Sequence, residues 1–216
     1  PEPNSFGYTD AVVDAAFPAL LASGGRAFFL CTSLRAMREA CELVRDEFKT
    51  RGLDYPVLLQ GEGSRTELLD RFRSLGNAVL VASQSFWEGV DVPGEALSLV
   101  IIDKLPFPPP NDPLVEARSK RLESQGRSPF NDYFVPEAVV ALKQGAGRLI
   151  RSETDTGVLV VCDPRLTGMA YGKRLLASLP PMRKLTNASE FELALSQLTK
   201  TSTTALNGGR FCASTS

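Results

Sequence analysis

The chain has 216 residues, of which 43% are hydrophobic and 23% charged, a composition typical of a globular protein with one sizeable core. Its net charge of −1 excludes a general basic field, so any nucleic-acid binding must come from locally placed Lys, Arg and backbone donors. Histidine is absent, which excludes His-based zinc sites and Ser-His-Asp catalysis. The four cysteines show no C-x-x-C spacing, and Cys31 and Cys162 are expected to be buried free thiols of an intracellular protein.

Targeting and membrane signals are missing from the sequence. No apolar run approaches the length of a membrane span, and no signal-peptide pattern opens the chain. The first residue is Pro1 rather than methionine, so we expect an excised fragment or a processed product.

The first half of the chain alternates helical and extended patterns. Residues 1–10 are expected to form a flexible lead-in, followed by a helix over residues 11–23 that Pro18 weakens. Short apolar runs predict five strands. They cover residues 26–31, 56–59, 78–82, 97–102 and 158–162. Helical patterns follow the first two strands, and Ser64 with Glu67 forms a capping box for the second of these helices.

The second half adds a connector and further helices. The proline-rich residues 104–113 predict a stiff, extended connector. The helix that follows carries three basic side chains, Arg118, Lys120 and Arg121. They could form a track for single-stranded DNA, although a solvated face is the simpler interpretation. Ser189 and Glu192 are expected to cap a last helix, and the chain from Thr199 on is expected to be a Ser/Thr-rich tail.

Strands that alternate with helices predict a three-layer α/β fold, with a mainly parallel sheet between helices on both faces. Ligands of such sheets bind at the carboxyl ends of the strands. Thr32 and Ser33 follow the first strand, where helix N–H groups could bind an anion or where either residue could simply be an N-cap. Residues 60–62 follow the second strand and are equally consistent with an ordinary turn.

The loop after the third strand has a stronger pattern, Ser83-Gln84-Ser85-Phe86-Trp87-Glu88-Gly89-Val90-Asp91. Two carboxylates, Glu88 and Asp91, flank Gly89, and a pure turn would not need two aromatic residues beside them. We interpret Phe86 and Trp87 as core residues and the two carboxylates as functional. After the fifth strand comes Asp163-Pro164-Arg165. The side chains of Asp163 and Arg165 could pair with each other or with the segment around Arg148.

A second strong pattern lies in residues 136–151, where Pro136 suits the first helical position. If the segment is one helix, its apolar face carries Val139, Leu142, Ala146 and Leu149. Its opposite face carries Gln144, Arg148 and Arg151, spaced i, i+4 and i+7. Two internal glycines destabilise a helix by roughly 1 kcal/mol each, so close approach of a ligand would explain them better than a surface helix does. Guanidinium groups suit phosphate oxygens, although a solvated face is the alternative.

These motifs resemble a known family. The Q-x-x-G-R-x-x-R of residues 144–151 resembles motif VI of superfamily-2 helicases, and residues 83–91 resemble motif V in the F-W-E-G-x-D form of the DinG-like branch. Residues 28–33 resemble motif IV, and the K-L-P-F connector is similar to one in the same branch. The resemblance covers about residues 26–175 and is to the C-terminal motor domain, the second RecA-like domain, of DinG-like, XPD-type DNA helicases.

The resemblance implies domains and site residues. We expect a lead-in and helix over residues 1–25, the RecA-like domain over residues 26–186, and a C-terminal helix and tail over residues 187–216. The implied catalytic residues are Arg148, Arg151 and Gln144. The implied lining of the ATP cleft is Glu88, Gly89, Asp91 and Gly147. The implied contacts to the DNA backbone are Thr32, Ser33, Ser83 and Ser85.

The resemblance also implies cofactors and partners. The chain contains no G-x-x-x-x-G-K-[ST] loop and no D-E-x-H motif, so ATP and Mg²⁺ are expected to bind mainly on an N-terminal motor domain of the same protein. A 4Fe–4S cluster is left open for that domain, and no metal is expected in this chain. The other implied partner is single-stranded or forked DNA, with no membrane, in the bacterial cytoplasm or nucleoid.

The implied activity is ATP-driven translocation from five-prime to three-prime and duplex unwinding in DNA repair or replication, with this fragment inactive alone. Two alternatives stay open: a non-catalytic RecA-like interaction module, and half of an RNA helicase, because motif VI is shared across the superfamily. A nuclease is disfavoured, since the sequence has no carboxylate cluster with a metal-site pattern.

Overall fold

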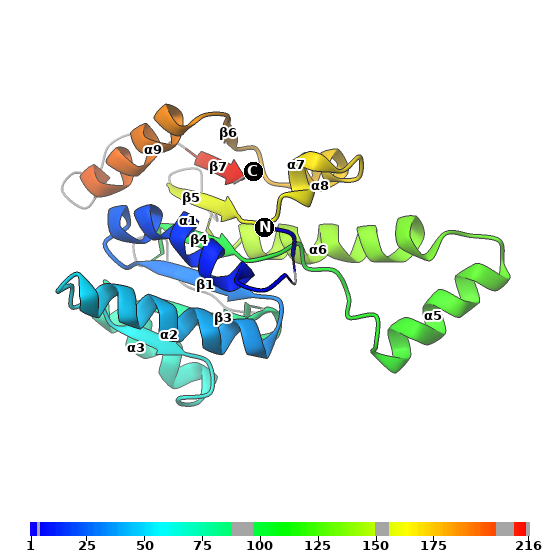
Figure 1. The fold of residues 1–216 in the computed structure, drawn as a ribbon, viewed down its shortest axis with the longest axis horizontal. Coiled ribbons are helices and arrows are strands. Elements are labelled where there is room, and N and C mark those ends of the chain that lie inside the picture. Colours follow the sequence, from blue (N-terminus) through cyan, green and yellow to red (C-terminus); the bar gives the residue numbers. More distant parts are fainter. Residues whose placement is uncertain (4, 88–96, 150–155, 202–209, 215–216) are drawn as a thin grey trace.

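The fold is a parallel sheet covered by helices on both faces (Figure 1). The computed structural model describes residues 1–3, 5–87, 97–149, 156–201 and 210–214. The described strands are β1 (Ala27–Cys31), β2 (Val57–Leu59), β3 (Val79–Ser83), β4 (Leu99–Ile102), β5 (Gly157–Val161), β6 (Arg183–Leu185) and β7 (Arg210–Ser214). They form one sheet in the order β2-β3-β1-β4-β5-β7-β6, and every pair is parallel. The predicted three-layer α/β class is confirmed.

Two hydrophobic clusters fill the spaces between the layers. One face of the sheet packs under α1 (Tyr8–Ala22), α2 (Leu34–Thr50) and α9 (Ala188–Thr201). The other face packs under α3 (Arg65–Leu75), α4 (Gln84–Trp87), α6 (Val135–Ala146), α7 (Arg165–Gly168) and α8 (Gly172–Ser178). Along β1, Phe29 contributes to the first cluster and Phe28 to the second, as the two-residue period of a strand requires. Because helices cover both faces, the strands are apolar without alternation.

One helix projects from the body. The connector leads from β4 to α5 (Pro113–Ser124), which Asp112 caps by accepting from the N–H groups of Leu114 and Val115. Val115 is its one buried residue, and α5 lies apart from the sheet in Figure 1. A π-helical turn, η2 (Phe130–Phe134), then leads into α6. Lys120 pairs with Glu116 on the surface of α5, in keeping with the solvated face that was the simpler interpretation.

Local signals predicted the elements well. The five predicted strands are present, each shifted at its ends by two residues or fewer, and Ser64 and Glu67 form the predicted capping box. Cys31 and Cys162 are buried free thiols, as predicted. Among the described residues, no helix has the combination of length and apolar character that crossing a bilayer requires.

The two ends of the chain differ from expectation. The lead-in is shorter than predicted, because α1 begins at Tyr8 and buries that side chain. The predicted tail contains β7, which pairs with both β5 and β6. The last helix is capped by Asn187, whose Oδ1 accepts from the Glu190 N–H at 2.9 Å, and not by Ser189. The apolar run of β7 is only three residues long, too short to be recognised as a strand, and both Asn187 and Ser189 are residue types that suit an N-cap.

Candidate functional site

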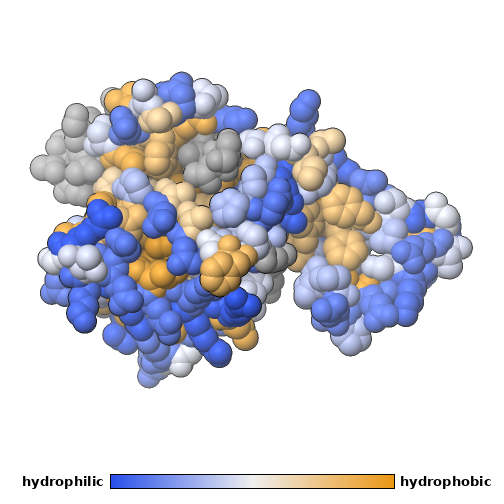
Figure 2. Space-filling model, viewed as in Figure 1, coloured by the Kyte–Doolittle hydropathy of each residue, from blue (hydrophilic) through white to orange (hydrophobic). Residues whose placement is uncertain are grey.

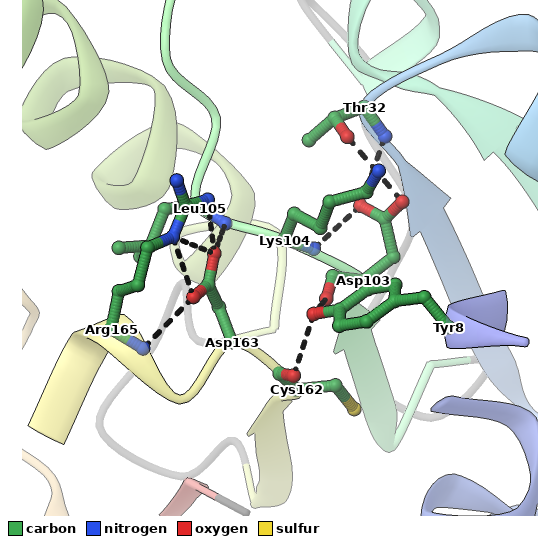
Figure 3. Close-up of polar contacts among 8 residues, drawn as sticks. All are labelled: Tyr8, Thr32, Asp103, Lys104, Leu105, Cys162, Asp163 and Arg165. Atoms are coloured by element: carbon green, nitrogen blue, oxygen red, sulfur yellow. Dashed lines mark hydrogen bonds and ion pairs between the residues drawn. The ribbon is translucent and has the colours of Figure 1, made fainter. Parts of the chain in front are cut away.

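The carboxyl ends of the central strands meet at one edge of the sheet, as the parallel fold requires. Cys31 of β1 is in register with Ser83 of β3, and Ile102 of β4 is in register with Val161 of β5. The residues that follow these strands therefore form a common edge, here called the strand-end edge. Polar side chains from distant parts of the chain meet along it (Figure 3).

Asp103 links the ends of β1 and β4. Its Oδ1 accepts from the N–H groups of Thr32 at 2.9 Å and Lys104 at 2.6 Å, and its Oδ2 accepts from the Thr32 hydroxyl at 3.4 Å. The side chain is 3% exposed, and this burial raises the pKa of Asp103 to about 6, although Lys104 opposes the rise. Thr32, a predicted DNA contact, is thus held inward by a carboxylate, which leaves its backbone N–H committed.

Ser33 begins α2 as an N-cap. Its hydroxyl oxygen accepts from the Ala36 N–H at 3.2 Å, so the simpler of the two interpretations is confirmed for Ser33. The side chain is exposed, so its hydroxyl group can still donate a hydrogen bond to a group outside the helix. Capping and a contact to an anion are therefore compatible at this residue.

Gln60 orders the end of β3. Its Oε1 accepts from the Ser83 N–H at 2.7 Å and from the Ser83 hydroxyl at 2.9 Å. Ser83 is buried, whereas Ser85, whose hydroxyl lies 3.0 Å from that of Ser83, is exposed. Of the two predicted contacts in this loop, Ser85 is the one that faces solvent. Residues 60–62 do form a turn, but Gln60 also fixes the neighbouring strand end.

Asp163 and Arg165 pair with each other, which was one of two predicted alternatives. Nη2 of Arg165 lies 2.6 Å from Oδ2 of Asp163, and Nε lies 2.9 Å from Oδ1. Asp163 is fully buried and also accepts from the Leu105 N–H at 2.8 Å. Hydrogen bonding to Asp163 raises the pKa of Arg165 against the opposing effect of burial. The pair fixes the start of the connector against β5 (Figure 3).

Tyr8 joins α1 to the same edge. Its hydroxyl donates to the carbonyl oxygens of Asp103 at 3.0 Å and Cys162 at 2.9 Å, at the ends of β4 and β5. Burial raises the pKa of the phenol, and Asp163 raises it further, so Tyr8 stays a neutral donor.

The motif VI segment is a helix that ends early. α6 ends at Ala146, and the next bonds run from Arg148 N–H to Gly145 O and from Leu149 N–H to Ala146 O. The assumption of one helix over residues 136–151 is therefore wrong for residues 147–149, since two glycines weaken the last turn and the tighter i to i−3 pattern replaces it, while residues 150 and 151 lie outside the described residues. The predicted apolar face is confirmed for Leu142, Ala146 and Leu149, which are buried, while Val139 is half-buried and Gln144 is exposed.

Leu149 packs against Gly157 at the start of β5, where a side chain would not fit. A Cβ at Gly157 would lie 2.4 Å from Leu149 Cδ1 and 2.8 Å from Ser98 O. This contact places the backbone of Arg148 over the α6 face, near the start of β5. Arg148 therefore lies on the side of the sheet that α6 covers. It follows a helix, unlike the candidate residues of the strand-end edge, which lie at or just after the ends of strands.

The charge of a second arginine, Arg65, acts on Arg148. Burial lowers the pKa of Arg148, and the positive charge of Arg65 lowers it further. Arg65 is the first residue of α3, and its Nη2 donates to the carbonyl oxygen of Phe86 at 2.7 Å. Its guanidinium also stands 5.5 Å from the centroid of the Phe86 ring, which is buried as predicted. Arg65 therefore joins the start of α3 to the motif V helix, α4, and its charge acts on Arg148 in the motif VI turn.

Arg65 and Arg148 are two cationic side chains of this region, and the guanidinium group suits phosphate oxygens. The other predicted cleft and finger residues, Glu88, Gly89, Asp91 and Arg151, lie outside the described residues. Within the described part of the chain, no cluster of three or more His, Cys, Asp or Glu residues could hold a metal ion.

Four residues of these clusters were not selected as site residues from the sequence: Tyr8, Gln60, Arg65 and Asp103. Gln60 and Asp103 directly follow strands, so their position was a usable signal. Arg65 follows the capping residue of α3, and nothing local distinguishes it from other surface arginines.

Comparisons with known proteins identify the family of this chain. Residues 18–182 match the family described as "Helicase C-terminal domain". The chain is 51% identical over 181 residues to "ATP-dependent DNA helicase YoaA" of Escherichia coli (strain K12), covering 84% of this chain and 28% of that protein. It is 42% identical over 181 residues to "ATP-dependent helicase DinG" of Mycobacterium tuberculosis, covering 84% of this chain and 26% of that protein. The chain spans about a quarter of the length of these relatives.

Solved structures show the same fold. An XPD helicase structure superposes with a TM-score of 0.58 at 21% identity, covering 79% of this chain and 30% of that one. At this identity the likeness establishes the fold alone.

Proposed function

Because this chain belongs to the helicase C-terminal domain family, we propose that it is the second RecA-like domain of a DinG-like, XPD-type ATP-dependent DNA helicase. The family match over residues 18–182 is the observation that carries the proposal. Activity, substrate and partners belong to the whole protein. This chain spans about a quarter of the length of the matched relatives.

On the nucleotide side, Arg148 binds the terminal phosphates of ATP, with Arg151 and the exposed Gln144 beside it. ATP and Mg²⁺, held mainly by the N-terminal motor domain, supply the phosphoryl transfer. Arg148 stabilises the negative charge that develops on the transferred group, a role for which its guanidinium is permanently charged. Glu88, Gly89, Asp91 and Gly147 line the cleft. The support is that the charge of Arg65, whose guanidinium contacts the motif V helix at Phe86, acts on Arg148.

On the DNA side, the strand-end edge contacts the backbone of one strand. Ser33 and Ser85 are exposed hydroxyls and make the direct contacts. Thr32 and Ser83 contribute by holding the two turns in place through Asp103 and Gln60. Closure on ATP and opening after hydrolysis shift these contacts along the strand, because ATP binds the closed state more tightly. We also propose that the whole protein moves along DNA from five-prime to three-prime. It acts in DNA repair or replication, within the bacterial cytoplasm or nucleoid.

The finger assignment is tested in the full-length protein. Arg148→Ala and Arg151→Ala are each expected to lower DNA-stimulated ATP turnover by about 10³- to 10⁵-fold, the range for loss of an arginine finger. Arg71→Ala is the matched control, because Arg71 is an exposed arginine on α3 and lies outside the proposed cleft. Turnover is measured with single-stranded DNA in excess, and folding is checked by circular dichroism. Wild-type turnover in Arg148→Ala would remove the assigned role.

A further inference from the structure

Three aromatic rings from distant segments form one cluster where α5 joins the body. Phe107 of the connector, Phe130 at the start of η2, and Tyr171 before α8 contact one another pairwise. The ring centroids are 5.7 Å apart for Phe107–Phe130, 5.7 Å for Phe107–Tyr171 and 5.1 Å for Phe130–Tyr171. Phe130 is 41% exposed, and the other two rings are half-buried. Figure 2 shows hydrophobic surface gathered at this junction.

The cluster is fixed to the strand-end edge. The guanidinium of Arg165 stands 5.5 Å from the centroid of Phe107 and is held in place by the buried Asp163. Asp163 also accepts from the N–H of Leu105, two residues before Phe107. Phe107 follows Lys104 by three residues, so at most about 11 Å of extended chain separates the rings from that edge.

The charges around the rings are mainly positive. Lys173 and Arg174 are exposed and directly follow the Tyr171-Gly172 turn at the start of α8. The Arg165 cation lies on the Phe107 ring. The acidic groups that act on Tyr171 are Asp163, which is paired with Arg165, and Glu2. Asp132 near Phe130 is paired with Arg127. Rings beside cations match a base and its phosphate better than they match an apolar protein surface.

We propose that Phe107, Phe130 and Tyr171 form a stacking platform for a base of the single strand whose backbone lies along the strand-end edge. This inference rests on the proposed function and extends it from phosphate contacts to base contacts. Single-strand binders combine a positive groove with aromatic side chains on which bases stack, and such stacking tolerates any sequence. Phe130 supplies the exposed ring, and Phe107 and Tyr171 hold it in position.

The test separates stacking from phosphate binding. The 216-residue chain is titrated at low salt, by fluorescence anisotropy, with labelled oligo(dT) and with an abasic oligonucleotide of equal length that keeps every phosphate. The wild-type chain is expected to bind oligo(dT) about tenfold more tightly, the effect of losing one stacked base. Phe130→Ala and Tyr171→Ala are expected to lose most of this preference. Tyr171→Phe keeps the ring and is expected to retain it.

Leu193→Ala is the matched control, because Leu193 is another exposed apolar side chain, 51% exposed, on α9. It is expected to keep the wild-type preference. Equal wild-type affinity for the two oligonucleotides, or a full preference in Phe130→Ala, would overturn the platform while leaving phosphate binding intact. If Phe130→Ala keeps the preference for oligo(dT) but no longer binds the N-terminal motor domain, the rings belong to a protein interface instead. Absence of wild-type binding to either oligonucleotide would overturn the DNA-facing proposal itself.

Discussion

Asp103 is a buried carboxyl group whose ionisation opposes folding. Its pKa is raised from an ordinary 3.8 to about 6 by burial, so the folded chain holds this proton more tightly than the unfolded chain does. The stability from this group is therefore present below about pH 4 and is lost as the pH rises through about 6. The difference is equivalent to about 3 kcal/mol at most.

Asp103→Asn is expected to remove that loss, because the amide oxygen can still accept from the Thr32 and Lys104 N–H groups. The free energy of unfolding is measured in urea at pH 4 and pH 7. The wild-type chain should lose up to about 3 kcal/mol more than the variant over this interval. Asp70→Asn, which changes an exposed carboxylate on α3, is the control and should follow the wild type. Identical pH profiles for wild type and Asp103→Asn would contradict the prediction.

At the residue scale, hydrogen-bond partners that lie close together in the sequence could be predicted. The capping box joins Ser64 and Glu67 three residues apart, and its two residue types at that spacing are the signal. Asp103 and its partner Thr32 are 71 residues apart, and Arg65 and Phe86 are 21 apart. Such pairs are brought together by the strand order, which the sequence alone does not specify.

At the scale of elements, hydrophobic runs identified the central strands and missed the polar edge. β6 exposes Arg183 and Lys184 and buries only Leu185, so its sequence has no apolar run to detect. The motif VI helix was predicted too long because its periodicity continues through Leu149, which is buried although it lies beyond the helix end. Periodicity reports which residues are buried, whereas the two glycines decide where the helix stops.

The N-terminus of α9 gives a direct test at this scale. Asn187 accepts from the Glu190 N–H, and the Glu190 carboxylate in turn accepts from the Thr186 N–H at 2.7 Å. Asn187→Ala is expected to destabilise the chain by about 1 kcal/mol, because it removes the cap of a helix whose Ala194 and Leu198 lie in the core. Ser189→Ala, at the cap expected from the sequence, should change stability by less than about 0.5 kcal/mol. Urea unfolding of both variants decides between the two positions, and a larger loss for Ser189→Ala would contradict the structure.

For the whole molecule, the proposed engine is divided between two domains. The chain provides Arg148, on which the charge of Arg65 acts, and the Ser33 and Ser85 hydroxyls at the strand-end edge. Its sequence contains no glycine-rich phosphate loop. Under the proposed function, nucleotide hydrolysis therefore requires surfaces from the N-terminal motor domain, whereas DNA contact does not. The two activities should separate experimentally.

The chain alone is expected to show no ATP hydrolysis above background with Mg²⁺ and single-stranded DNA, because no residue pattern in it cradles the phosphates. Adding the separately expressed N-terminal motor domain at high concentration should restore DNA-dependent turnover, and adding it to the Arg148→Ala chain should not. Phosphate release measures both. Robust turnover by the wild-type chain alone would refute the division of labour. Failure of the mixture to turn over, with both parts folded and associated, would favour the non-catalytic interaction module over the motor.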